Sequence, residues 1–420
     1  MVRPNIKRFA RSTQKGLLSY RNSMTTAKQD VFVEFWANEA GFQRDDWADL
    51  ETPCYVISLT NLENNFKILK KVEEETGCKI LLALKSFAMF SVFPLMRTYI
   101  SGSEASSINE ARLGHEEFGG ETHVFSPSYT EKNINAYLKY ADHLVFNSFS
   151  QWQRFRKTVV TNKKISCGIR VNVEHSEVAV DMYDPSSASS RFGVTKNNFA
   201  KADLAGVEGM HFHNLCQSGA DALERTLKVF EEKFGEFLPQ MKWVNFGGGH
   251  HITRNDYDVL LLCKLIIAFK RQHPHLEVYL EPGEAVGLNA GVLVAEVVDI
   301  FRNDRNMAIL DVSAATHMPD VLEMPYLPMI LGAKPARAGG NIYRLSGPGC
   351  LTGDIIGDYA FPQPLKIGQK LVFLNMAAYT MVKNNTFNGI NLPSIAIIDQ
   401  QNKIKIIKKF DYADFKNRLS

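Results

Sequence analysis

Eight short β-prone runs alternate with helix-like segments between Lys79 and Gly283, and this rhythm constrains the fold more than any other feature of the chain. Segments such as Asn109–Phe118, Glu131–Tyr140 and Ala220–Phe237 show the helical spacing of apolar residues. Eight such units over about 200 residues predict a closed parallel (β/α)₈ barrel of the TIM type. The runs are Lys79–Leu84, Tyr99–Ser103, Thr122–Phe125, His143–Phe146, Ser166–Val171, Gly209–His213, Lys242–Phe246 and Glu277–Leu280.

The alternation of strand-like and helix-like segments stops after about residue 291. Four strand-like runs are separated there by Gly/Pro-rich loops with little helical pattern, which predicts a second, mostly antiparallel β-domain. We therefore expect an α/β protein with the barrel in residues 52–290 and the β-domain in residues 26–51 and 291–420. The four runs are Val292–Phe301, Met307–Val312, Lys370–Leu374 and Ser394–Ile398.

Composition argues against several classes of partner. The formal net charge is only +3 over 420 residues, and no basic stripe with interleaved aromatic residues occurs, so we expect no nucleic-acid partner. The longest apolar stretch, Val259–Phe269, contains Lys264 and is too short to span a bilayer, so we expect no membrane association.

The cysteines and the N-terminus bear on the cellular compartment. The 6 cysteines lie far apart without a C-x-x-C motif, which predicts neither a zinc site nor a disulfide framework and favours the reducing cytoplasm. The first 29 residues hold seven Lys/Arg and no acid. We expect residues 1–25 to be a disordered extension or a targeting segment.

The chemistry of a (β/α)₈ barrel lies at the carboxyl ends of its strands, so the residues that follow the runs are the candidates for a site. Lys85 ends the first run, and an amine desolvated by an apolar strand is a candidate Schiff-base lysine. A lysine that merely reaches solvent from a strand end fits the pattern as well. Glu281 ends the eighth run, where a carboxylate could bind the ring nitrogen of a cofactor or form an ion pair at the barrel rim.

Two further strand ends add candidates. His211 and His213 point to the same face of the sixth run. One of them could stack on a planar ring or occupy a hydrogen-bonded core position, and the pair could bind zinc, although no third ligand follows at the usual spacing. The triplet Gly247–Gly249 follows the seventh run and could hold a phosphate through backbone N–H groups, or form only a tight turn. We expect no metal.

The predicted β-domain contains a loop dense in glycine, Ser346–Asp354, which presents Cys350 and Asp354. A cysteine beside glycines is expected to be exposed, whereas structural cysteines are usually buried. The segments Asn375–Tyr379 and Thr386–Gly389 follow in the same domain. This loop is therefore a second candidate for function.

With these residues assembled, the chain resembles the fold-type III pyridoxal-phosphate decarboxylases. That family includes the ornithine, diaminopimelate and arginine decarboxylases, with alanine racemase as a more distant relative. The resemblance runs from about Thr52 to the end of the chain. The family's elements occur in its order: Lys85, His213 after a strand, the triple glycine, Glu281-Pro-Gly, Gly347-Pro-x-Cys350 and Ala378-Tyr-Thr380.

Within this family, the chain most resembles the branch that acts on carboxynorspermidine and carboxyspermidine. The tract from His317 to Tyr326 is the most specific for this branch. The resemblance implies a role in polyamine biosynthesis, in which loss of CO₂ yields norspermidine or spermidine. The other segments that carry it are Ala83–Phe87, Gly102–Ser107, Ser176–Val178, Tyr183–Pro185, His211–Cys216 and Cys350–Asp354.

The resemblance also implies a role for each candidate residue. Lys85 would bind pyridoxal 5′-phosphate covalently, His213 would stack on its ring, and Glu281 would bind the pyridine nitrogen. Cys350 would enter the site from the partner subunit of a homodimer and donate a proton. The implied phosphate contacts are Gly248, Gly249 and Tyr379, and the implied contacts to the cationic groups of the substrate are Glu284, Asp320, Glu323 and Asp354.

Two departures from the family pattern affect these roles. The amino-acid decarboxylases carry arginine after Glu-Pro-Gly, where this chain has Glu284, and a glutamate suits an ammonium group rather than a phosphate or carboxylate. The ornithine-type Gly-Ser after the histidine is here Leu215-Cys216, so the phosphate contacts differ in detail.

Four alternatives stay open at this point. A decarboxylase of the diaminopimelate, arginine or ornithine type has the same fold. A racemase would prefer a weaker electron sink than Glu281 provides, and a non-catalytic regulator of this fold would be expected to lose the lysine or the glycine triplet. A sugar-processing barrel would need Glu281 and Glu284 to face each other across a glycosidic bond, which their spacing on a Pro-Gly turn disfavours.

Overall fold

The computed structural model describes residues 42–420 except 163, 178–183 and 188. The chain divides into two compact units. The barrel unit is Glu63–Leu288, and the sheet unit comprises the described residues up to Leu62 together with Asn289–Ser420. The expectation for residues 1–25 lies outside the described residues.

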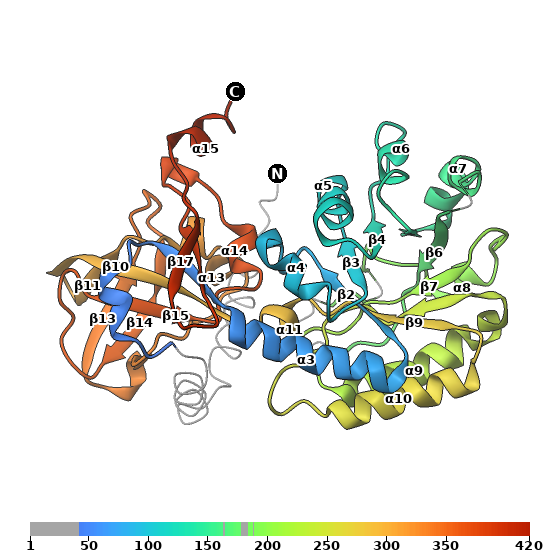
Figure 1. Ribbon diagram of the computed structural model, residues 1–420, viewed down its shortest axis with the longest axis horizontal. Coiled ribbons are helices and arrows are strands. Elements are labelled where there is room, and N and C mark those ends of the chain that lie inside the picture. Colours follow the sequence, from blue (N-terminus) through green and yellow to red (C-terminus); the bar gives the residue numbers. More distant parts are fainter. Residues whose placement is uncertain (1–41, 163, 178–183, 188) are drawn as a thin grey trace, which may run out of the picture. The chain divides into compact units, whose positions relative to one another are not determined.

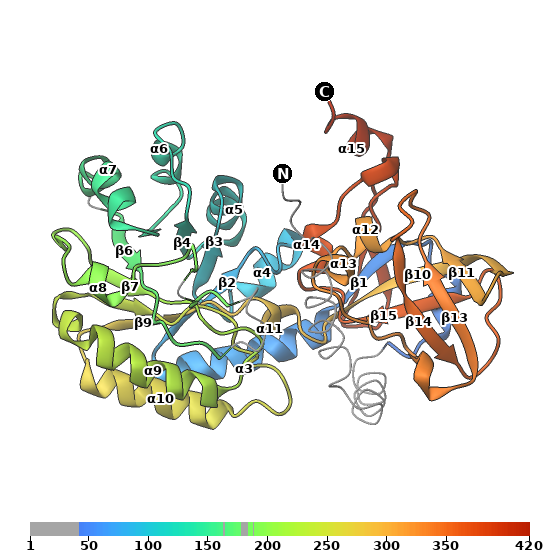
Figure 2. The same cartoon turned by 180° about the vertical axis from the view of Figure 1, so that it is seen from behind.

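The barrel unit contains a closed barrel of eight parallel strands, β2 to β9, in which each strand pairs with the next and β9 pairs with β2 (Figures 1 and 2). This confirms the predicted barrel. The strands are β2 Lys79–Ala83, β3 Gly102–Ala105, β4 Glu121–Ser126, β5 His143–Phe146, β6 Ser166–Arg170, β7 Gly209–His211, β8 Trp243–Asn245 and β9 Glu277–Leu280.

Helices follow most of the barrel strands, and the amphipathic α9 and α10 lie side by side (Figure 1). Asp258 caps α10 by accepting a hydrogen bond from the Leu261 N–H at 2.8 Å. None of the helices in the described part of the chain has the length and apolarity needed to cross a membrane. The helices are α3 Leu59–Thr76, α4 Phe93–Met96, α5 Ile108–Leu113, α6 Ile134–Tyr137, α7 Phe149–Val160, α8 Lys196–Phe199, α9 Ala220–Phe234, α10 Val259–Gln272 and α11 Glu284–Gly287.

Trp243 of β8 fills the interior of the barrel because two neighbouring strands carry glycine beside it. A Cβ built on Gly209 of β7 would lie 2.0 Å from the indole ring, and one built on Gly168 of β6 would lie 2.3 Å from it. The indole Nε1–H donates to Ser166 Oγ at 2.8 Å. The absence of side chains at these two positions therefore makes room for the largest residue of the barrel core.

The sheet unit is built on a mostly antiparallel sheet in the order β12-β14-β13-β11-β10-β1-β16-β17, with β15 also paired to β10. Two pairs, β1 with β16 and β11 with β13, are parallel. The strands are β1 Cys54–Ser58, β10 Gly291–Arg302, β11 Asn306–Leu310, β12 Lys334–Pro335, β13 Asn341–Ser346, β14 Ile355–Phe361, β15 Lys370–Leu374, β16 Ser394–Ile398 and β17 Ile404–Lys408. Its helices are α12 Ala314–His317, α13 Asp320–Glu323, α14 Thr380–Lys383 and α15 Tyr412–Lys416.

The boundary between the two units differs from the predicted one. Strand β1, Cys54–Ser58, lies inside the segment expected to belong to the barrel, yet it pairs with β10 and β16 of the sheet unit. All five of its residues are buried. Such an apolar run predicts a buried strand but cannot indicate which sheet receives it.

Gly209→Ala is expected to destabilise the protein by about 1–3 kcal/mol, because the added methyl group overlaps the Trp243 ring in a packed core. Gly235→Ala is the matched control, since a Cβ built on Gly235 meets no atom within 4 Å. Urea unfolding of both variants measures the effect. Equal stability of the two variants would contradict this account of the barrel core.

Candidate active site

Candidate residues that follow four barrel strands in the sequence come together in the barrel unit. Lys85 follows β2, His213 follows β7, the glycine triplet follows β8 and Glu281 follows β9. The Glu281 N–H donates to Gly247 O at 2.8 Å, and the Gly248 N–H donates to His213 Nδ1 at 3.1 Å. The ends of β7, β8 and β9 are thus joined by hydrogen bonds.

Glu281 is a buried carboxylate with partners on both oxygens. The Asn245 amide donates to Oε1 at 2.6 Å, and His211 Nε2 lies 3.2 Å from Oε2. Burial alone would raise the pKa of Glu281, but His211 and, more weakly, Lys85 lower it below its usual range. Glu281 is therefore an ionised group inside the barrel.

His213 is neutral and its tautomer is set by the backbone. Burial, and then the charge of Lys85, lower the pKa of His213 well below its usual value. Because Nδ1 accepts from the Gly248 N–H, the ring proton is on Nε2. Glu281 also lies within 4.8 Å of His211 and His213, so it supplies the third potential zinc ligand that the sequence spacing did not. In the structure, however, His213 Nδ1 accepts the hydrogen bond from the Gly248 N–H, so this nitrogen is used within the protein and not for a metal ion.

The glycine triplet needs glycine at all three positions. Gly247 has a φ of 71°, and a Cβ there would lie 2.3 Å from Phe212 O. Gly249 has a φ of 83°, and a Cβ there would lie 2.0 Å from Leu215 O. A Cβ on Gly248 would lie 2.4 Å from Glu281 O. The turn is therefore packed closely against the ends of β7 and β9, and no other residue fits it.

Two charged residues of this cluster were not singled out from the sequence. Glu104 of β3 is buried, its Oε2 has no hydrogen-bond partner, and burial and the nearby Glu281 raise its pKa to about 8. Arg170 of β6 is buried, its Nη2 donates to His213 O at 3.1 Å, and its guanidinium lies 4.6 Å from the centre of the Phe125 ring. The alternation of side chains along β3 and β6, once the strands were assigned, could have pointed both residues into the barrel.

Glu284 begins α11 and is held by side chains of the barrel unit. Gln217 Nε2 donates to its two oxygens at 3.0 and 2.9 Å, and His251 Nε2 lies 3.1 Å from Oε2. Burial opposes ionisation of Glu284, but the hydrogen bond from His251 and its charge lower the pKa of the carboxyl overall. Glu284 is thus an anion at the same end of the barrel as Glu281.

Asp354 organises the glycine-rich loop of the sheet unit. Its Oδ1 accepts from Ser313 Oγ at 2.9 Å and from the Ala315 N–H at 3.2 Å, while Oδ2 accepts from the Gly349 N–H at 2.9 Å. The residue is 3% exposed. This network holds the loop, and the predicted contact of Asp354 with a substrate stays a prediction.

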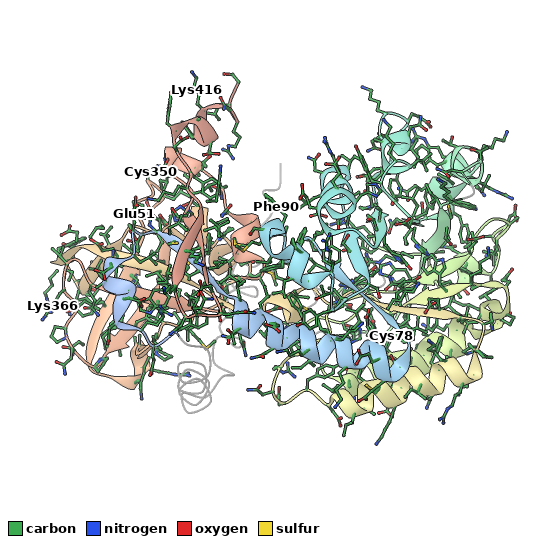
Figure 3. The ribbon with its side chains drawn as sticks, viewed as in Figure 1. Glu51, Cys78, Phe90, Cys350, Lys366 and Lys416 are labelled. Atoms are coloured by element: carbon green, nitrogen blue, oxygen red, sulfur yellow. The ribbon has the colours of Figure 1, made fainter. Side chains whose placement is uncertain are left out.

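The remaining candidates also lie in the sheet unit. Cys350 is exposed (Figure 3). Asp320 and Glu323, on α13, both bind the ammonium group of Lys383. Tyr379 precedes α14 with a φ of 57°, a backbone conformation that is strained for a tyrosine. The sheet unit therefore holds Cys350, Asp320, Glu323 and Tyr379, and the barrel unit holds Lys85, His213, Gly248, Gly249, Glu281 and Glu284.

The carboxylate of a second polar cluster in the barrel unit is balanced by a neighbouring lysine. The rings of His123 and His143 stack with centroids 3.9 Å apart. The neighbouring Glu121 binds the ammonium of Lys79 and accepts from Tyr279 Oη at 2.9 Å. Because the Lys79 ammonium balances the charge of Glu121, we interpret this cluster as part of the barrel core.

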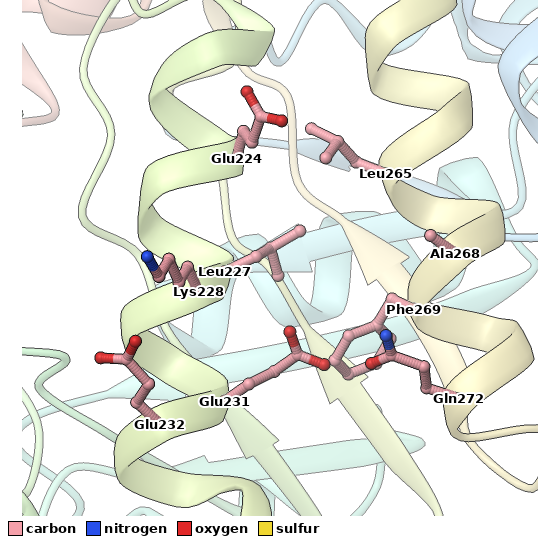
Figure 4. A pocket seen from close by; sticks show the side chains of 9 residues that line it. All are labelled: Glu224, Leu227, Lys228, Glu231, Glu232, Leu265, Ala268, Phe269 and Gln272. Carbon is pink, nitrogen blue, oxygen red and sulfur yellow. The ribbon is translucent and has the colours of Figure 1, made fainter.

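A groove on the outer layer of the barrel unit lies between α9 and α10 (Figure 4). Its lining comes from helices and not from strand ends, so it is separate from the cluster around Glu281. The residues that line it are Glu224, Leu227, Lys228, Glu231, Glu232, Leu265, Ala268, Phe269 and Gln272.

Known proteins share this fold and much of this sequence. The family described as "Pyridoxal-dependent decarboxylase, C-terminal sheet domain" matches residues 54–377. A carboxyaminopropylagmatine decarboxylase of Synechocystis is 42% identical over 89% of this chain and 96% of its own. A carboxynorspermidine/carboxyspermidine decarboxylase of Campylobacter jejuni is 43% identical over 88% of this chain and 98% of its own.

A solved structure agrees with these similarities. The crystal structure of carboxynorspermidine decarboxylase from Campylobacter jejuni, complexed with norspermidine, aligns with a TM-score of 0.81 at 43% identity. The alignment covers 88% of this chain and 100% of that one.

Glu104→Gln is expected to raise the stability of the protein at alkaline pH and to weaken its dependence on pH. The pKa of Glu104 is raised from 4.5 to about 8, so the folded protein keeps a proton that the unfolded chain releases between these values. The free energy of unfolding of the wild type, relative to the variant, therefore falls as the pH rises through this window, by about 2–4 kcal/mol in total. Urea titrations at about pH 5 and about pH 8 measure the difference.

The exposed Glu224→Gln on α9 is the matched control for this experiment and should follow the wild type at both pH values. A Glu104→Gln variant whose stability differs from the wild type by the same amount at both pH values would contradict the buried, protonated state of Glu104.

Proposed function

Since the chain belongs to the family of pyridoxal-dependent decarboxylases, we propose that its reaction is the loss of CO₂ from carboxynorspermidine and carboxyspermidine. The products are norspermidine and spermidine, which makes the enzyme part of polyamine biosynthesis. The observation that carries the choice of substrate is the similarity to the Campylobacter jejuni enzyme, whose structure contains norspermidine. Glu284 supports it, because a carboxylate suits an ammonium group at the position where the amino-acid decarboxylases have arginine.

The barrel unit fits pyridoxal 5′-phosphate in three respects. Lys85 supplies a half-buried amine at a strand end, and the ionised Glu281 can accept a hydrogen bond from a protonated ring nitrogen. The turn at Gly248 and Gly249 has no room for side chains, and glycine there would let the backbone approach a bound anion closely. These are the three groups that a pyridine aldehyde phosphate requires.

Each residue of the barrel unit then has a defined task. Lys85 would hold the cofactor through its amine. Glu281 would keep a proton on the ring nitrogen, His213 would stack on the ring, and Gly248 and Gly249 would hold the phosphate. When bound, the cofactor supplies the electron sink for the electron pair left by CO₂. Tyr379 of the sheet unit contributes to phosphate binding.

Cys350 completes the reaction as general acid in a homodimer. Its thiol donates the proton that replaces CO₂ on the substrate carbon. Its exposure in the single chain is what a residue that enters the site of a partner subunit requires. The dimer therefore has two sites, each with residues from both copies.

The acidic residues Glu284, Asp320 and Glu323 bind the ammonium groups of the substrate. The Gln217 amide on Glu284 and the Lys383 ammonium on Asp320 and Glu323 are donors that a polyamine nitrogen can replace. Charge-assisted hydrogen bonds of this kind fix a flexible cationic chain.

The enzyme works in the cytoplasm. All six cysteines are free in the structure, and the exposed Cys216 and Cys350 would be open to oxidation elsewhere. A reducing compartment keeps the thiol of Cys350 available for proton transfer.

Carboxyaminopropylagmatine is the second candidate substrate, because a relative named for it is 42% identical to this chain. It differs from carboxynorspermidine and carboxyspermidine because it carries a guanidinium group at the end away from the carboxyl group. The planar guanidinium forms paired hydrogen bonds with a carboxylate, whereas an ammonium binds as a compact charge. The acidic residues of the site suit either group, so turnover decides between them.

We expect the purified enzyme to release CO₂ fastest from carboxynorspermidine or carboxyspermidine when these compounds, carboxyaminopropylagmatine, diaminopimelate, ornithine and arginine are compared at equal concentration. Release of labelled CO₂ with identification of the amine product is the measurement. A higher kcat/KM for carboxyaminopropylagmatine would replace the first proposal by the second, and turnover of diaminopimelate alone would contradict both.

Lys85→Ala is expected to abolish covalent attachment of the cofactor. Borohydride reduction of the wild type incubated with pyridoxal phosphate should add the mass of the reduced cofactor to the peptide that contains Lys85. Lys79, at the start of β2, is the internal control and should stay unmodified. Cofactor mass on another lysine, or none on Lys85, would remove Lys85 from its proposed role.

A further inference from the structure

The side chain of Asn388 holds Cys350 at two points. Asn388 Oδ1 accepts a hydrogen bond from the Cys350 backbone N–H at 3.0 Å, and Asn388 Nδ2 donates to Cys350 Sγ at 3.1 Å. The Asn388 amide thus accepts one hydrogen bond through its oxygen and donates the other through its nitrogen. Together the two bonds fix the backbone and the sulfur of Cys350. Both residues belong to the sheet unit.

Asn388 keeps this position through a backbone conformation that few residues adopt. Its φ and ψ are 60° and 10°, in the left-handed region where asparagine and glycine are the residues best tolerated. The turn is fixed from its other side because Asn385 Oδ1 accepts from the Phe387 N–H at 2.9 Å. The choice of asparagine therefore serves both the turn and the thiol.

The loop that carries Cys350 is fixed independently. The buried carboxylate of Asp354 holds Gly349, the residue before Cys350, through its N–H. Asp354 sets where the backbone runs, whereas the Asn388 amide is the group that reaches the sulfur atom itself.

We propose that Asn388 is a positioning residue for the Cys350 thiol, which it aims and whose anion it stabilises after proton transfer. This inference rests on the proposed role of Cys350 as general acid. In that step the S–H bond breaks, the proton forms a C–H bond at the carbon that lost CO₂, and the electron pair stays on Sγ. An N–H directed at the sulfur stabilises that charge, as hydrogen bonds to charged groups do.

Two variants separate the amide from the backbone. Asn388→Gly keeps the left-handed conformation without strain and removes the amide. Asn388→Asp keeps the size of the side chain and an oxygen that can accept from the Cys350 N–H, but it removes the donor and adds a negative charge beside the sulfur. Asn402→Gly is the matched control, because Asn402 has a φ of 63° and its side chain contacts Arg44 instead of a cysteine.

The first readout is the alkylation rate of Cys350 by iodoacetamide at neutral pH in the holoenzyme, followed by mass spectrometry. We expect the rate to fall about tenfold in Asn388→Asp, the factor that corresponds to one lost charge-assisted hydrogen bond, and less in Asn388→Gly. Asn402→Gly should react at the wild-type rate. A structural role alone would leave these rates equal once cofactor content and circular dichroism match.

The second readout is the fate of the proton during turnover. A proton delivered to the cofactor instead of the substrate carbon gives, after hydrolysis, an aldehyde product and an aminated cofactor. Asn388→Asp and Asn388→Gly should raise the share of this abortive product and lower kcat with little change in KM, and Cys350→Ala should raise the share further.

The outcomes distinguish the inference from the function beneath it. If Cys350→Ala raises the abortive share but both Asn388 variants match the wild type in alkylation and product ratio, the role of Asn388 is overturned and the proposed function stands. If Cys350→Ala leaves the product ratio unchanged, Cys350 is not the acid, and the role of Asn388 falls with it.

Discussion

The candidate site depends on one ionised carboxylate inside the barrel. Removing Glu281 from water costs several kcal/mol unless other groups replace its hydration. The Asn245 amide and His211 do so directly, and the positive charges of Lys85 and Arg170 lie in the same cluster. His211 ends β7, Asn245 ends β8 and Glu281 follows β9, so the parallel barrel brings the two direct partners to the buried anion and stabilises it.

Neighbouring residues take protonation states that fit this anion. Glu104 holds its proton because the residue is buried and because Glu281 already carries a negative charge nearby. His213 is neutral because it is buried and because a positive charge would lie beside those of Lys85 and Arg170. The chemistry proposed for Glu281, keeping a ring nitrogen protonated, uses this buried anion.

Much of this could be predicted from the sequence because it is local. The barrel follows from the alternation of strands and helices, and Lys85, His213, Gly248 and Glu281 follow from their places after strands. Strands β13 and β14 were missed because they lie within Gly- and Pro-rich segments whose pairing is set by distant partners. Local sequence patterns also could not predict contacts between residues far apart in the chain. These are the hydrogen bonds of Asp354 to Ser313 and Ala315, of Asn388 to Cys350 and of Gln217 to Glu284.

The most direct test of the account is the protonation state of the cofactor's ring nitrogen. Purified wild type and Glu281→Gln can be loaded with pyridoxal phosphate labelled with ¹⁵N in the ring, and the nitrogen chemical shift measured by NMR. The account predicts a protonated nitrogen in the wild type and an unprotonated one in the variant at neutral pH. The same shift in both proteins would contradict the claim that the buried carboxylate of Glu281 controls the electron sink.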